Sequence, residues 1–287
     1  MKFDLATMAA RQGLKRRETV FAPILMTTAL ANDLAAISRM MIAPWLGSRT
    51  KILDVYAREL ARVLQTDAVD DLTSLLATLG EEVERLILDL TPTLRTWAFR
   101  VEGWHRGKWS RSVLAGTDVD IATLIGPTDA IETIEAFMAR QTALIRNVSD
   151  EARGRIADLV YRGLQQRLPS RQVGKAITEA LGLSRRRANR IAADQSTKLA
   201  SALDAQRQRE AGLNEYRYRH SGKLHFRPDH KARDGRIFEL NTGKEVEFKK
   251  GKKTYTGTVI PDGDGPGEPP YCGCVREGLL VIDNQVL

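Results

Sequence analysis

Cysteine is scarce in this chain: its 287 residues include two, Cys272 and Cys274, separated by Gly273 alone. A disulfide between them would close a ring too short to relax into ordinary disulfide geometry without strain. The opening residues "MKFDLATMAA" also lack the charged and then apolar segments of a secretory signal. These absences argue against a disulfide-stapled secreted domain, and we expect synthesis in a reducing host cytoplasm.

Long uninterrupted hydrophobic runs are also absent. The most apolar stretch, "VFAPILMTTALANDLAAISRMM", is broken by Asn32 and Asp33. It is too polar for a membrane span and favours an amphipathic helix. We therefore expect no membrane partner. The 43% hydrophobic content is typical of a chain that folds around a core.

Positive charge is concentrated in one region. Residues 151–260 contain 25 Lys and Arg against 12 Asp and Glu, whereas the whole chain carries a net charge of +8. Such a block suits contact with nucleic acid or with an acidic protein surface. The alternative is a set of solvated helix faces.

Residues 1–212 show helical periodicity almost throughout. Three successive helices are predicted, because Ser149, Ser170 and Ser184 each precede an apolar stripe and each can act as an N-cap. Gly182 is expected to end the second helix and Gly212 the third.

After Gly212 the apolar pattern changes to a period of two residues. The segments "EYRYRHSGKLHFR", "GRIFEL", "EVEFKKGKKTYTGTVI" and "LLVID" are expected to be strands, with a hairpin turn at Gly251. The predicted class is α+β, a mostly helical N-terminal body followed by a small β-rich C-terminal module. We divide the chain into a helical N-terminal region (1–130), a second helical region (131–212) and the β-rich module (213–287).

Three motifs in the second half of the chain carry a family resemblance. They are "RANRIAADQ" on the last long helix, "RPDHKARDG" with Arg227, His230, Asp234 and Gly235, and "PPYCGC" with Pro269, Pro270, Cys272 and Cys274. Together, over roughly residues 130–282, they resemble the phage Mu F-like family of minor head, or head morphogenesis, proteins. Two positions depart from the family pattern. The family often has Trp where this chain has "YRYRH", which we interpret as an exchange within the core, and it usually has Arg where this chain has Gly273.

The resemblance implies a minor structural protein of a tailed double-stranded DNA phage. Such a protein is made in the host cytoplasm and is part of the virion, in the head or neck. It acts at the portal vertex or the capsid interior in head morphogenesis and DNA ejection. The implied partners are the portal protein, the major capsid protein and packaged double-stranded DNA. Residues 1–130 match no motif.

The family pattern also implies that His230 and the two cysteines come together. A structural zinc ion held by His230, Cys272 and Cys274 would then order the Pro/Gly-rich loop, with His225 as the preferred fourth ligand and Asp229 or Asp234 as substitutes. The alternative is simple packing, with the cysteines as small apolar side chains and His230 bonded to the turn backbone.

Two groups of basic residues are candidate contacts to DNA or the portal. One is the hairpin tip with Lys249, Lys250, Lys252 and Lys253; the other is the helix with Arg185, Arg186 and Arg187. The hairpin tip is the better candidate, because the arginines spread around most of their helix.

No catalytic constellation is evident, and the chain is not expected to be an enzyme. A metal-dependent nuclease is the first rival function, because His220, His225 and His230 are spaced five residues apart near the CxC pair. Two thiolates and a histidine, however, suit a closed structural zinc site better than a catalytic one. The second rival is a non-specific DNA-binding protein that lays "SRRRANR" along phosphates.

Overall fold

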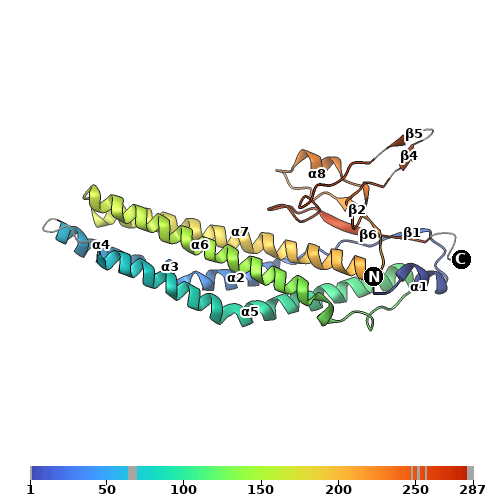
Figure 1. Cartoon of the computed structure of the whole chain (residues 1–287), viewed down its shortest axis with the longest axis horizontal. Helices are drawn as coiled ribbons and strands as arrows, with labels where there is room; N and C mark the ends of the chain where they lie inside the picture. The colour runs from blue at the N-terminus through green and yellow to red at the C-terminus, as the bar shows by residue number, and fades with distance from the viewer. Residues whose placement is uncertain (1, 64–69, 247, 251–252, 256, 283–287) are drawn as a thin grey trace. The chain divides into compact units, whose positions relative to one another are not determined.

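The computed structural model describes residues 2–63, 70–246, 248–250, 253–255 and 257–282. Helices fill most of the chain up to residue 210 and strands predominate after it (Figure 1), so the expected α+β class is confirmed. The helices are α1 (Leu5–Arg11), α2 (Thr28–Met41), α3 (Ala43–Gly47), α4 (Arg49–Val63), α5 (Asp70–Thr117), α6 (Ile131–Gln165), α7 (Ser170–Glu210) and α8 (Pro228–Ala232), with a 3-10 turn at Pro127–Ala130. The strands are β1 (Glu18–Val20), β2 (Glu215–Arg219), β3 (Ile237–Glu239), β4 (Phe248–Lys250), β5 (Lys253–Tyr255) and β6 (Val275–Val281).

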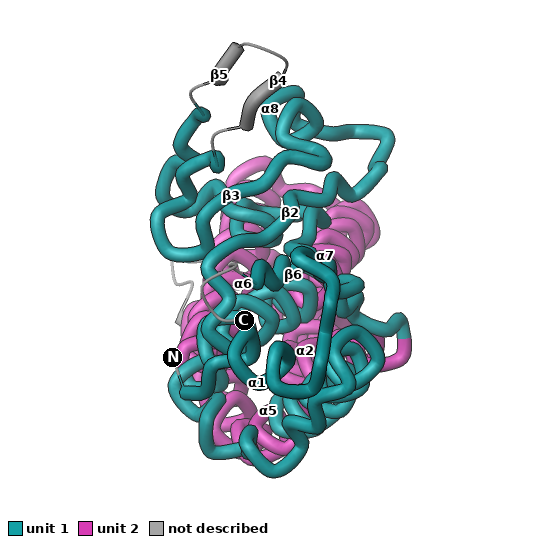
Figure 2. The backbone as a smooth tube through the Cα atoms, turned by 90° about the vertical axis from the view of Figure 1, so that its right-hand side faces the viewer, with its two compact units in different colours: residues 1–28, 98–135, 194–287 teal, residues 29–97, 136–193 magenta. Residues whose placement is uncertain are grey.

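The chain divides into two compact units, coloured separately in Figure 2. Unit 1 contains residues 1–28, 98–135 and 194–287, and unit 2 contains residues 29–97 and 136–193. Each unit combines segments that are far apart in sequence, and the division at residues 130/131 and 212/213 stays a prediction. None of the helices in the described ranges has both the length and the apolarity that crossing a bilayer requires.

Ser149 does not begin a helix, contrary to the sequence prediction. Helix α6 is continuous from Ile131 to Gln165, and Ser149 lies buried in its middle. Its hydroxyl accepts a hydrogen bond of 2.8 Å from Nε1 of Trp45, which is fully buried in α3 of the same unit. The serine therefore satisfies a buried indole N–H instead of capping a helix end.

Ser170 begins α7, as predicted, but Ser184 does not begin another helix. Helix α7 runs through Gly182 and Ser184, and the Ser184 hydroxyl donates to the Ala180 carbonyl one turn earlier. One glycine costs a helix about 1 kcal/mol, less than burial of a flanking apolar stripe contributes. The helix ends at Glu210, and Gly212 adopts the expected left-handed φ of 73°.

Residues 18–27 depart from the helical prediction for the N-terminal part. Helix α2 begins only at Thr28, and Glu18–Val20 form the strand β1. This strand pairs antiparallel with β6 from the other end of the chain, so that Thr19 lies opposite Leu280. No local periodicity marks a three-residue strand whose partner is so distant.

Unit 1 is built around an antiparallel sheet with the strand order β1-β6-β2-β3. Strand β2 ends at Arg219, so the predicted strand through residue 227 is wrong beyond that point, and those residues form a loop leading into α8. Strand β6 begins at Val275, directly after the second cysteine and earlier than predicted. The positions of both cysteines are therefore fixed by the start of a central strand.

Two apolar clusters fill unit 1. One includes Phe21, Trp109 and Leu280, and the Phe21 and Trp109 rings meet edge to face at 5.3 Å. The other contains the tyrosines of β2, Phe238 of β3 and both cysteines. Burial of these tyrosines agrees with our interpretation of "YRYRH" as a core segment.

Candidate metal centre and adjoining pocket

His230 is presented by the short helix α8. Pro228 is at the start of this helix, where a backbone N–H would have no acceptor within the helix, and its fixed φ favours the helical turn. The helix ends at Ala232 with Arg233 as its C-cap, and in the turn that follows Gly235 has a φ of 78° and donates its N–H to the Tyr218 carbonyl of β2. The His230 side chain is buried, and its ring meets the Tyr218 ring edge on at 6.1 Å.

The two cysteines lie at the end of the loop 261–274, which is held against α7. The Tyr271 N–H donates to Oδ1 of Asp194 over 2.5 Å, and Ser201 Oγ donates to the Pro266 carbonyl over 2.7 Å. Gly267 is required at its position, because a Cβ there would lie 2.6 Å from Ser201 Oγ and its φ is 79°. Side chains of α7 therefore order a loop that has little regular structure of its own.

Residues from all three sequence motifs meet in unit 1. Asp194 belongs to "RANRIAADQ", His230 to "RPDHKARDG", and Tyr271 and the cysteines to "PPYCGC". The first motif binds the backbone of the third, and the second places its histidine beside the sulfurs of the third. Convergence of three segments from distant parts of the chain explains why each was uninformative alone.

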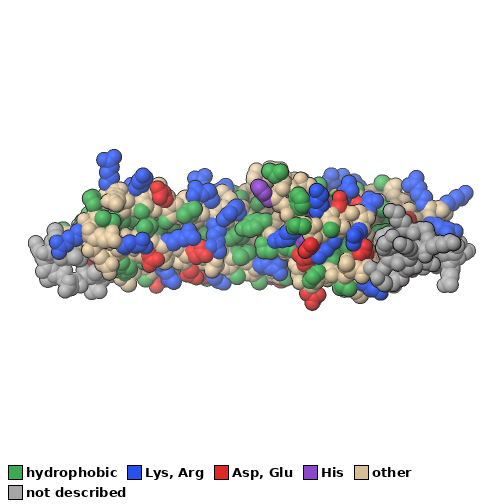
Figure 3. Space-filling model, turned by 90° about the horizontal axis from the view of Figure 1, so that it is seen from above, with side chains coloured by type: hydrophobic (Ala, Val, Ile, Leu, Met, Phe, Trp, Pro, Cys, Tyr) green, Lys and Arg blue, Asp and Glu red, His purple; other side chains and the backbone are tan. Residues whose placement is uncertain are grey.

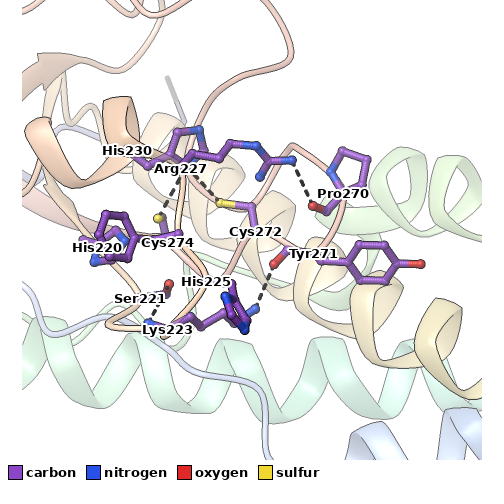
Figure 4. A pocket seen from close by; sticks show the side chains of 12 residues that line it. His220, Ser221, Lys223, His225, Arg227, His230, Pro270, Tyr271, Cys272 and Cys274 are labelled. Carbon is purple, nitrogen blue, oxygen red and sulfur yellow. Dashed lines mark hydrogen bonds between the residues drawn. The ribbon is translucent and has the colours of Figure 1, made fainter.

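The donor atoms of His230, Cys272 and Cys274 form a compact cluster (Figure 4). His230 Nδ1 lies 3.5 Å from Sγ of Cys272 and 3.7 Å from Sγ of Cys274, and the three donor atoms all lie within 4.8 Å of one another. All three side chains are buried, and both cysteines are free thiols. The structure thus brings together the three residues that the family pattern implied.

Asp264 orients the histidine. Its Oδ1 lies 2.9 Å from His230 Nε2, and its Oδ2 accepts a hydrogen bond of 2.7 Å from Arg233. Burial works against the charged form, but these bonds to His230 and Arg233 hold the pKa of Asp264 below its usual value. An ionised Asp264 accepts a hydrogen bond from Nε2–H, so in the neutral imidazole the lone pair of Nδ1 faces the two sulfurs.

The cysteines are electrostatically inequivalent. A hydrogen bond from the Cys274 thiol lowers the pKa of Cys272, and the same interaction, together with burial, raises the pKa of Cys274. Burial also raises the pKa of the adjacent Tyr218 hydroxyl. One thiolate is therefore favoured at the cluster, and a divalent cation would stabilise the second.

The donor set fits zinc. Two thiolates and one imidazole are soft and borderline ligands, and a carboxylate bonded to the far nitrogen of a histidine is the usual support for a metal-binding imidazole. His225 is exposed and lines the same pocket, yet it lies outside the cluster, as do the exposed Asp229 and Asp234. Asp234 instead accepts a hydrogen bond from the His220 N–H. The part of the chain that the structure describes supplies no fourth ligand of the His, Cys, Asp or Glu type.

A pocket of about 330 Å³ adjoins the cluster. Its walls are the loop 220–227 on one side and residues 270–274 on the other, with His230 between them. Lys223 Nζ donates to the Tyr271 carbonyl over 2.8 Å, and Arg227 donates to the Pro270 carbonyl over 3.3 Å, so both cations cross from the first loop to the second (Figure 4).

The Lys223 side chain lies against Gly273. A Cβ at residue 273 would lie 2.8 Å from Cε and 3.0 Å from Nζ of this lysine. The lysine therefore occupies the space that a side chain between the cysteines would need. Lys223 thus places a positive charge beside Gly273, at the position where the family resemblance led us to expect Arg.

The predicted basic contacts are only partly described. Strands β4 and β5 pair antiparallel, with Lys250 opposite Lys253, as a lysine-rich hairpin requires, whereas Lys252 lies outside the described residues. Arg185 and Arg186 are exposed on α7. Arg187 is instead bonded to Asn147 and paired with Glu151 in unit 2. On the face shown in Figure 3, basic side chains are spread among acidic and apolar ones.

The role of Asp264 was missed by sequence reasoning. It stands in "PDGDGPGEPP", where Asp-Gly pairs are ordinary signals for turns. Asp194 was quoted within its motif, but nothing in the sequence revealed its bond to Tyr271. Distance along the chain hid both roles.

One family model matches part of the chain. Residues 154–277 match the family model described as "Phage Mu protein F like protein". The Mu F-like family is confirmed for this region. The matched segment contains Asp194, His230, Asp264 and both cysteines, so the whole cluster lies within the Mu F-like region.

One curated protein is similar to part of this chain. An uncharacterized protein of Haemophilus influenzae is 25% identical over 187 residues, which are 65% of this chain and 38% of the relative. The chain thus spans well under half of that protein. No solved structure matches.

Proposed function

We propose that this chain is a minor structural protein of a tailed double-stranded DNA phage head, acting at the portal vertex or the capsid interior in head morphogenesis and genome delivery. The observation that carries this proposal is the Mu F-like region at residues 154–277, within which two of the motifs form one buried cluster and Asp194 of the other motif binds the loop that holds the cysteines. The portal protein is the proposed direct partner, and the major capsid protein and packaged DNA are further partners.

Within this function, the cluster of His230, Cys272 and Cys274 links two segments of the β-rich module. His230 and both cysteines would hold a structural zinc ion, while Asp264 keeps the imidazole in the metal-binding tautomer. A bound zinc ion would tie α8 to the start of β6. This link through zinc would order the loop 261–274 at a site where the module has few apolar residues to pack.

The pocket favours this structural function over hydrolysis of phosphodiesters. A nuclease metal site needs a nearby general base or hard oxygen ligands. Within the described chain, the pocket walls carry histidines, Lys223 and Arg227 but no Asp or Glu. These groups can bind an anion, but none is a carboxylate that could hold Mg²⁺.

A null mutant of the phage or prophage that encodes the chain tests the proposal. We expect particles that lack DNA or fail to deliver it, with both defects restored by the wild-type chain in trans. Quantitative mass spectrometry of complemented particles should find the chain in low copy number, and it should co-purify with the portal ring. Fully infectious particles formed without the chain would contradict the proposal. So would degradation of plasmid DNA by the purified protein with Zn²⁺ or Mg²⁺, which would favour a nuclease.

The hairpin Lys249, Lys250, Lys252 and Lys253 is the proposed contact to DNA or portal. Replacing these lysines by Gln should weaken DNA binding. The slope of the logarithm of the binding constant against the logarithm of the salt concentration should become shallower by roughly one for each phosphate that is no longer neutralised. Replacing Arg185, Arg186 and Arg187 by Gln provides the comparison on α7. An unchanged affinity for DNA in the hairpin variant would leave the portal as its partner.

A further inference from the structure

We infer that the pocket formed by residues 220–227 and 270–274 is a docking site for an acidic segment of a partner protein. The inference rests on the proposed function, which places the chain among other virion proteins, and it adds the chemistry of one contact.

The two cations of the pocket, Lys223 and Arg227, have no carboxylate partners among the described residues. Lys223 and Arg227 cross the pocket and bond to backbone carbonyls, which are neutral acceptors. In the described chain neither cation has a carboxylate within ion-pair distance, and no Asp or Glu lines the pocket. The pocket therefore offers two fixed cations to an incoming anion.

Three carboxylates near the pocket are engaged elsewhere. Asp194 pairs with Lys198 and accepts from the Tyr271 N–H, Asp264 pairs with Arg233, and Asp234 accepts from a backbone N–H. Metal loading does not remove the excess, because two thiolates and one divalent cation together carry no net charge. Without zinc, the one thiolate that the cluster favours offsets one of the two positive charges, so the pocket keeps a net positive charge in both states.

Exposed apolar surface lies beside these cations. Leu224 is 86% exposed, the highest value among the large hydrophobic side chains of the described chain. It stands next to Lys223, and the pocket residues Phe226 and Tyr271 are 43% and 50% exposed. Exposed apolar and aromatic groups beside charged ones are typical of protein interfaces.

This combination favours a peptide over duplex DNA. The phosphate backbone of a duplex has no apolar group to cover Leu224, and its rigid surface would meet only the rim of a pocket of about 330 Å³. An acidic peptide with a neighbouring apolar side chain can place its carboxylates between Lys223 and Arg227 and cover the leucine.

Peptide binding with matched variants tests the inference. The probe is a fluorescein-labelled peptide Gly-Asp-Glu-Leu-Asp-Glu-Gly, compared with its Asn/Gln analogue by fluorescence anisotropy at physiological salt. The pocket variant Lys223→Gln/Arg227→Gln keeps donors for the loop carbonyls and removes both charges. The control Lys15→Gln/Arg16→Gln removes two exposed charges outside the pocket. Zinc content and circular dichroism verify folding, and each pocket substitution is also made singly.

The wild type should bind the acidic peptide at least about tenfold more tightly than the analogue. The pocket variant should lose that preference, and the control should keep it within about twofold. An absent preference in the wild type, or an equal loss in both variants, would overturn the inference. So would duplex DNA binding that depends on Lys223 and Arg227 while peptide binding does not. If the pocket variant enters virions and supports infection like the wild type, docking fails while the proposed function stands.

Discussion

The imidazole of His230 is held by Asp264, whose Oδ1 lies 2.9 Å from Nε2, so that Nδ1 is free to face the sulfurs of the CxC pair. A carboxylate in this position sets the tautomer of a metal-binding histidine and raises its basicity.

Replacing Asp264 by Asn should weaken zinc binding by about tenfold or more, because the neutral amide no longer favours a protonated Nε2. Competition with a chromophoric chelator measures the affinity. Asp262→Asn, two residues earlier on the same loop, is the matched control and should leave zinc affinity unchanged. Equal affinity in the wild type and Asp264→Asn would show that the carboxylate does not support a metal ligand.

Removing zinc should destabilise the β-rich module. Protein purified without a histidine tag or chelator should contain about one equivalent of zinc, and added chelator should lower the thermal midpoint. In Cys272→Ser/Cys274→Ser, zinc should be lost and chelator should have no effect. The affinity should fall as the pH falls, because thiols must lose protons to bind metal. Zinc below about a tenth of an equivalent, with an unchanged midpoint, would leave the packed but metal-free interpretation of the cluster.

Asp204 and His105 should give opposing pH dependences. Burial, partly opposed by Arg276, raises the pKa of Asp204 to about 7, whereas burial and the charge of Arg207 lower the pKa of His105 to about 3. The folded state thus binds the Asp204 proton more tightly than the unfolded state, and stability from this group is lost as the pH rises from about 4 to 7. For His105 the unfolded state binds the proton more tightly, so stability is lost as the pH falls from about 6.5 to 3.

Single substitutions should separate these two effects. Asp204→Asn should be destabilised by acid between pH 6.5 and 4 relative to the wild type, and His105→Gln should be destabilised as the pH rises over the same range. Each slope should approach about 1.4 kcal/mol per pH unit. Denaturant unfolding at several pH values measures them. Parallel profiles for the wild type and both variants would show that neither group has a shifted pKa.

Ser149→Ala should destabilise the protein by about 1–3 kcal/mol, because it leaves the buried Trp45 indole N–H without its acceptor. Ser184→Ala should cost less than about 0.5 kcal/mol, since that hydroxyl only supplements an intrahelical carbonyl. Urea unfolding measures both changes in the free energy of unfolding. Similar costs for the two serines would be the pattern expected if both acted as N-caps.

Local signals predicted the elements whose boundaries are local. Pro169 and Ser170 mark the start of α7, and Gly212 marks its end, because each acts through its own backbone geometry. Ser149 misled for a physical reason: a serine before acidic residues is a good cap, but a tryptophan in another segment uses its hydroxyl. The family pattern predicted the His230 cluster, whereas Asp264 depends on a loop that approaches α8 only in the folded chain.

The pairing of β1 with β6 sets an order of events during synthesis. Helices α2 to α7 make their internal hydrogen bonds as soon as their own residues are available, but β1 must wait for Leu279 and Val281 before its pairing can form. Strand β6, which follows Cys274 directly, is the strand that pairs with β1. A newly made chain therefore cannot present the finished pocket until β6 has been synthesised, which delays any recognition at that pocket until the helices that precede it have been made.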